Sequence, residues 1–66
     1  MHRKIKKKME QMGVTQVDMI LELQKQNVSV TPQLMSSILR GVVTYPKAQE
    51  VLKACELILE KREYEQ

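Results

Sequence analysis

Four polar side chains recur on one helix face in the middle of the chain. They stand at i, i+3, i+4 and i+7 and comprise Gln33, Ser36, Ser37 and Arg40. Gln and Ser donate and accept hydrogen bonds, and Arg adds a permanent positive charge. The row is either an ordinary solvated face or a surface that contacts a polar partner. The serines favour contact, because exposed helix positions usually hold better helix formers.

The elements that must position this row are two consecutive helices. Thr31 and Pro32 predict the start of a helix over residues 31–40, because Thr caps helices and Pro suits the first helical position. Gly41 is expected to end this helix in a left-handed conformation. Its inward face is apolar and comprises Leu34, Met35, Ile38 and Leu39.

A preceding helix is expected over residues 15–26. Thr15 caps it, and Asp18 completes a loose version of the capping box. Asn27 tolerates the left-handed conformation and closes the helix. The inward side chains of this helix and of the turn that follows it are Met19, Ile20, Leu23, Val28 and Val30.

Two further helices complete the predicted fold. An apolar stripe of Ile5, Met9 and Met12 predicts a helix over residues 3–12, which Gly13 ends. Pro46 is expected to start the last helix, over residues 46–62, after a loop over residues 42–45. The core face of the last helix comprises Ala48, Val51, Leu52, Cys55, Ile58 and Leu59. We therefore predict one all-α domain of four helices, over residues 1–66.

The charge of the chain is unevenly distributed. Residues 1–47 hold eight Lys/Arg and three Asp/Glu, a net charge of +5, whereas residues 48–66 carry a net charge of −2. A basic end suits a polyanion, because each neutralised phosphate releases condensed counterions. The alternative is that these lysines only keep a small protein in solution.

The composition argues against several classes of protein. One cysteine and one histidine allow neither an internal disulfide nor a Cys/His zinc site. We find no carboxylate pair, Ser/His/Asp set or Gly-rich phosphate loop, so we expect no enzyme, cofactor, metal or small-molecule ligand. Without a membrane span or a signal peptide, the expected location is cytoplasmic. Cys55 is expected to pack in the core, and His2 to belong to a terminal tail.

The run Thr15-Gln16, followed by Met19-Ile20 and then by residues 31–41, resembles the Cro and lambda-repressor-like (XRE-type) helix-turn-helix family. The resemblance covers roughly residues 3–60 and implies a four-helix helix-turn-helix DNA-binding domain. Three departures stand out. Ile20 replaces the small residue usual in the second helix, and Asn27 stands near the place of a common turn Gly. The stretch from Thr15 to Gly41 is also about two helical turns longer than the compact family version needs. The second helix or its turn is therefore enlarged relative to the family.

The resemblance also implies which residues touch double-stranded DNA. The base contacts would come from Gln33, Ser36 and Ser37. The contacts with the DNA backbone would come from Thr15, Gln16, Thr31, Arg40, Thr44, Tyr45 and Lys47, and the basic front would add Arg3, Lys4 and Lys7. Proteins of this type pair about a two-fold axis, and we predict a homodimer through Ala54, Leu57 and Tyr64.

The sequence thus predicts a sequence-specific transcriptional regulator of the Cro/repressor type, such as one from a phage or mobile element. The alternative is a helix-turn-helix-shaped protein-interaction module, an antirepressor or adaptor that does not bind DNA. The row on helix 31–40 and the basic front favour the first interpretation. The surplus apolar residues Val17, Leu21 and Leu57 favour the second.

Overall fold

The computed structural model describes residues 1–65, and side chains of residues 1–64, as four α-helices without a strand. In chain order these are α1 (His2–Met12), α2 (Gln16–Lys25), α3 (Pro32–Leu39) and α4 (Pro46–Glu65). The predicted all-α class is therefore confirmed. Within this part of the chain, no helix is both long and apolar enough to cross a membrane.

α2 and α3 each begin at a local N-cap. The Thr15 N–H donates to Asp18 Oδ2 and the Asp18 N–H donates to Thr15 Oγ1, both at 3.1 Å, which completes the capping box at α2. At α3, the Leu34 N–H donates to Thr31 Oγ1 at 3.1 Å, and Pro32 takes the first helical position. Both caps were predicted from the sequence.

Two helices, α1 and α3, end near a left-handed glycine. Gly13 follows α1 with a φ of 68°, and Gly41 follows α3 with a φ of 75°. Asn27 is the non-glycine residue with a positive φ, 63°, in the connection between α2 and α3. This connection spans residues 26–31, and Val30 is buried within it while Val28 is half-buried. α2 ends at Lys25, one residue before the predicted end.

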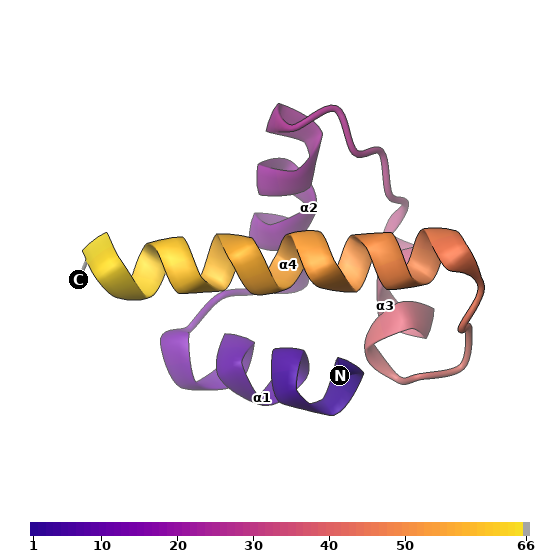
Figure 1. Ribbon diagram of the computed structural model, residues 1–66, viewed down its shortest axis with the longest axis horizontal. Coiled ribbons are helices and arrows are strands. Elements are labelled where there is room, and N and C mark those ends of the chain that lie inside the picture. The colour runs from indigo at the N-terminus through magenta and orange to yellow at the C-terminus, as the bar shows by residue number, and fades with distance from the viewer. Residues whose placement is uncertain (66) are drawn as a thin grey trace.

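The core is one cluster to which every helix contributes. α4 packs against α1 and α2, and α3 packs against the same two helices. Figure 1 shows α4 crossing the view, with α2 above it and α1 below. The core face predicted for the last helix is buried at all six positions: Ala48, Val51, Leu52, Cys55, Ile58 and Leu59.

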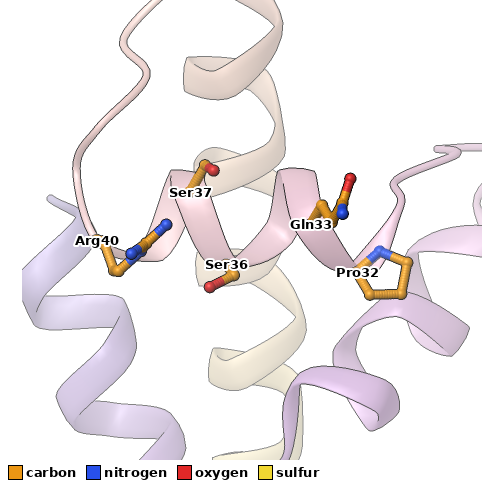
Figure 2. Close-up of a pocket in the computed structure, with 5 residues that line it drawn as sticks. All are labelled: Pro32, Gln33, Ser36, Ser37 and Arg40. Carbon is orange, nitrogen blue, oxygen red and sulfur yellow. The ribbon is translucent and has the colours of Figure 1, made fainter.

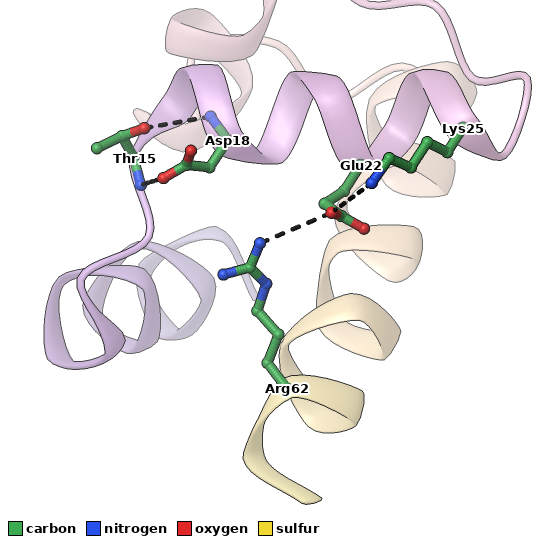
Figure 3. Close-up of polar contacts among 5 residues, drawn as sticks. All are labelled: Thr15, Asp18, Glu22, Lys25 and Arg62. Carbon is green, nitrogen blue, oxygen red and sulfur yellow. Dashed lines mark hydrogen bonds and ion pairs between the residues drawn. The ribbon is translucent and has the colours of Figure 1, made fainter. Parts of the chain in front are cut away.

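Two ion pairs connect the C-terminal half of α4 with α1 and α2. Lys8 Nζ of α1 lies 3.1 Å from Glu63 Oε2. Arg62 Nη2 lies 3.7 Å from Glu22 Oε1 of α2, which also receives Lys25 Nζ at 3.3 Å (Figure 3). α4 continues past the predicted end at residue 62, so Tyr64 belongs to the helix rather than to a tail.

Candidate nucleic-acid interface

The four-residue row predicted on α3 lies on its outer face. Met35 and Ile38 are fully buried and hold α3 against the core, which turns the opposite side outward. This outer row, which we call the α3 row, comprises Gln33, Ser36, Ser37 and Arg40, and together with Pro32 it lines a shallow hollow (Figure 2). The structure therefore brings together the residues predicted to contact bases.

The α3 row has short side chains in its middle and long side chains at its ends. Ser36 and Ser37 are half-buried, whereas Gln33 and Arg40 are exposed. Among the described residues, the side chains of the row make no hydrogen bond or ion pair with the rest of the protein. Their donors and acceptors are therefore available to a partner that fits against the two serines.

The start of α1 lies against the end of α3. A Cβ placed on Gly41 would lie 2.5 Å from both Cε1 and Nε2 of His2, so the imidazole covers this glycine. The prediction that His2 belongs to a tail is wrong: His2 begins α1 and is half-buried. The ring atoms Cε1, Nε2 and Cδ2 lie over the position that a side chain on residue 41 would occupy. As a result, the basic start of α1 lies beside Arg40, and Figure 2 shows the faint indigo ribbon of α1 there.

The α1 cations have different surroundings. Lys8 faces α4, where it pairs with Glu63 and is only 25% exposed. Lys4 and Lys7 are exposed, as is Arg3. The exposed Lys6 was not among the predicted DNA contacts, although it belongs to the same basic run. Only contacts made by the folded chain reveal which of these cations lie toward α3 and which lie toward α4.

The N-terminus of α2 is occupied by its own cap. Figure 3 shows the Thr15 backbone N–H and hydroxyl both engaged with Asp18. The hydrogen bonds from the Thr15 backbone and then from its hydroxyl lower the pKa of Asp18, with a smaller contribution from Arg62. A carboxylate charged at neutral pH thus stands in the first turn and repels a phosphate. Of the two predicted backbone contacts here, the exposed Gln16 keeps its side-chain amide available.

Thr31 and the loop residues occupy the borders of α3. The Thr31 hydroxyl oxygen accepts the Leu34 N–H and its side chain is exposed. In the loop before α4, the Thr44 carbonyl accepts the Gln49 side-chain amide at 3.4 Å, and Tyr45 is exposed. Lys47 lines a separate hollow beside the connection between α2 and α3, rather than the hollow of the α3 row.

The predicted dimer residues differ in their exposure. Leu57 is 60% exposed and Tyr64 is 93% exposed on α4. Ala54, in contrast, is partly buried and packs against the core of its own chain. Leu57 is therefore the apolar centre of the outer face of α4, and Ala54 lies at its edge.

Two other exposed apolar side chains belong to α2. Val17 and Leu21 are 64% and 52% exposed and follow each other by one helical turn. Leu21 also lines a hollow toward the C-terminal part of α4, together with Asp18, Glu22, Gln24, Lys25 and Arg62. This surface is separate from the α3 row.

Other kinds of site find no support in the described part of the chain. In it, no group of three or more His, Cys, Asp or Glu side chains is placed to hold a metal ion. Cys55 is fully buried, as predicted, and this burial raises the pKa of its thiol to about 12.

Comparisons with protein-family models, with curated proteins and with solved structures find no match to this chain. The arguments about its function therefore rest on its own residues and their arrangement.

Proposed function

We propose that this chain is a sequence-specific DNA-binding transcriptional regulator of the Cro/repressor type, with α2 and α3 as its helix-turn-helix. The observation that carries the proposal is the α3 row, whose polar side chains all face outward while the opposite side of α3 is buried. The second helix of such a motif lies in the major groove, with its first residues at the base edges.

The shape of the α3 row supports a close fit to DNA. The major groove is about 12 Å wide and admits one α-helix. Ser36 and Ser37 are short enough to let the helix approach the floor of the groove. Gln33, in the first turn, can pair with N6 and N7 of adenine, and the serines can hydrogen-bond several bases.

The ends of α3 suit the sugar-phosphate backbone. Arg40 stands at the C-terminal end, beside the basic start of α1. Gln16 begins α2 with an exposed amide, which can donate to a phosphate. Contacts of this kind fix the register of the protein on the duplex but read no sequence.

Binding to duplex DNA across a range of salt concentrations tests the proposal directly. Fluorescence anisotropy with a labelled random duplex is expected to show an affinity that falls linearly on logarithmic axes as salt rises. Selection from a random library is then expected to yield a preferred site. Arg40→Gln should weaken binding, whereas Lys25→Gln, which removes the same charge from the end of α2, should not. The proposal would be refuted if the wild-type protein showed no salt-dependent binding to duplex DNA.

We also propose that the regulator acts as a homodimer through the outer face of α4. Leu57 is surrounded there by exposed charges, namely Glu50, Lys53, Glu60 and Lys61. In an antiparallel pair of these helices, Glu50 stands opposite Lys61 of the second copy, and Lys53 stands opposite Glu60. The face is therefore complementary to itself, as a two-fold interface requires.

A second candidate function is a protein-interaction module that does not bind DNA. The exposed pair Val17 and Leu21 favours it, because neighbouring apolar side chains on a surface mark sites of protein contact. The DNA titration separates the two functions. A module of this kind shows no affinity for random duplex at low salt, and Leu21→Ser disrupts its binding to its protein partner.

A further inference from the structure

Two contacts fix the orientation of α1 between its neighbours. On one side, the His2 ring lies against Gly41 at the end of α3. On another side, Lys8 Nζ lies 3.1 Å from Glu63 Oε2 of α4. Helical periodicity then places the remaining cations of α1 relative to these two contacts.

The exposed cations form a band around α1. Lys6 follows His2 by four residues and so lies at the end of the band toward α3. Lys4 precedes Lys8 by four residues and so lies at the end toward α4. Arg3 and Lys7 are also four residues apart and lie side by side between these ends. All four of these side chains are exposed. Lys6 and Lys4 carry equal charge, but only Lys6 lies next to the residue that contacts α3.

We propose that Lys6 forms, with Arg40, a site for DNA backbone phosphates beside the α3 row, and that Lys4 stays outside it. The inference rests on the proposed function and specifies which part of the basic front serves it. It adds Lys6 to the predicted contacts and removes Lys4.

The chain limits this phosphate site at both ends. The His2 contact holds the first turn of α1 beside the last turn of α3, so Arg3 and Arg40 lie at the same end of the molecule. Glu10 follows Lys6 by one turn and is exposed, so its negative charge disfavours phosphate farther along α1. The site therefore comprises the first half of α1 and the end of α3.

Two single variants with the same loss of charge test the inference. Lys6→Gln and Lys4→Gln are titrated against a random duplex of about 20 base pairs over a range of salt. Lys6→Gln should lower the slope of log K against log salt by roughly 0.9, the contribution of one phosphate contact. Lys4→Gln should leave the slope near that of the wild type. Circular dichroism verifies that both variants remain helical.

The outcomes distinguish this inference from the proposed function. Equal slope losses in the two variants, or a larger loss for Lys4→Gln, overturn the assignment while DNA binding itself stands. A wild-type protein that does not bind DNA overturns both. Acetylation of lysines followed by mass spectrometry gives a second readout: the duplex should protect Lys6 more strongly than Lys4, and equal protection of the two contradicts the inference.

Discussion

The imidazole of His2 covers the α-carbon of Gly41, so the first turn of α1 closes over the residue that ends α3. The contact joins the two ends of a chain segment of about forty residues. It also fixes the end of α3, where Arg40 stands, relative to the cations of α1. Gly41 meets two demands at once, a left-handed backbone and the absence of a side chain.

Gly41→Ala is expected to destabilise the protein more than Gly13→Ala. Both substitutions place a Cβ on a positive φ, at a cost of about 1–3 kcal/mol. A Cβ on Gly13 meets no atom within 4 Å, whereas one on Gly41 meets the His2 ring. Urea unfolding measures both values, and adding His2→Ala should bring the cost at Gly41 close to that at Gly13. Equal costs in the wild-type background would show that the ring moves aside freely.

Gln33→Ala is expected to cost about 1–3 kcal/mol in binding to the preferred DNA site and to relax the preference at one base pair. Affinity for random duplex should hardly change, because base contacts add little to non-specific binding. Gln24→Ala, an equally exposed position on α2, serves as the control and should leave both affinities unchanged. A uniform loss on specific and random DNA would show that Gln33 touches only the backbone.

Leu57→Glu is expected to yield a folded monomer with much weaker binding to the preferred site. The glutamate places a charge without a partner in the apolar centre of the proposed two-fold interface. Sedimentation at tens of micromolar measures the association. Leu21→Glu changes a similarly exposed leucine on α2 and should leave the dimer intact. A wild-type monomer under these conditions contradicts the prediction, and a loss of helicity in Leu57→Glu would place this side chain in the monomer core.

Cys55 is expected to resist alkylation by iodoacetamide until the protein unfolds. Burial raises the pKa of its thiol from 9.0 to about 12, so the folded state favours the neutral thiol. The corresponding stability is fully present below pH 9 and is lost as the pH rises toward about 12. Cys55→Ala should therefore lose less stability over this range than the wild type, since lysines and tyrosines titrate equally in both. Rapid alkylation of the native protein would contradict the burial of this thiol.

Asp18 is expected to stabilise the folded protein by an amount that decreases at acid pH. Its pKa is lowered from 3.8 by the Thr15 hydrogen bonds, so the folded state favours the carboxylate. This contribution is present above pH 3.8 and is lost as the pH falls through the lower pKa of the folded state. In urea unfolding, the free energy of unfolding of Asp18→Asn should fall less steeply at acid pH than that of the wild type. An equally steep fall would mean that the capping box contributes no pH dependence.

The local features of the fold could be predicted from the sequence because they depend on neighbours in the chain. Thr15 and Thr31 cap their helices, Asn27 adopts the left-handed conformation, and the core face of α4 follows from its periodicity. The end of α4 was placed too early. Beyond residue 62, Glu63 pairs with Lys8 of α1, a contact between residues far apart in the chain that no local pattern contains.

The candidate site was predictable only in part, for the same reason. The α3 row follows from periodicity within one helix, and the structure keeps all four residues on one face. The division of the α1 cations depends on contacts of His2 with α3 and of Lys8 with α4, which join residues far apart in the chain. Lys6 and Lys4 are chemically identical in the sequence and become different only once α1 is packed.

The way α3 is held has a consequence for altering its specificity. α3 is held in place by its Thr31 cap, its buried side and Gly41. Among the described residues, the α3 row contributes no internal hydrogen bond. The exposed positions 33 and 40 can therefore be substituted with little loss of stability, whereas the half-buried positions 36 and 37 tolerate less change in size. Under the proposed function, recognition of a new DNA site would be selected first at positions 33 and 40.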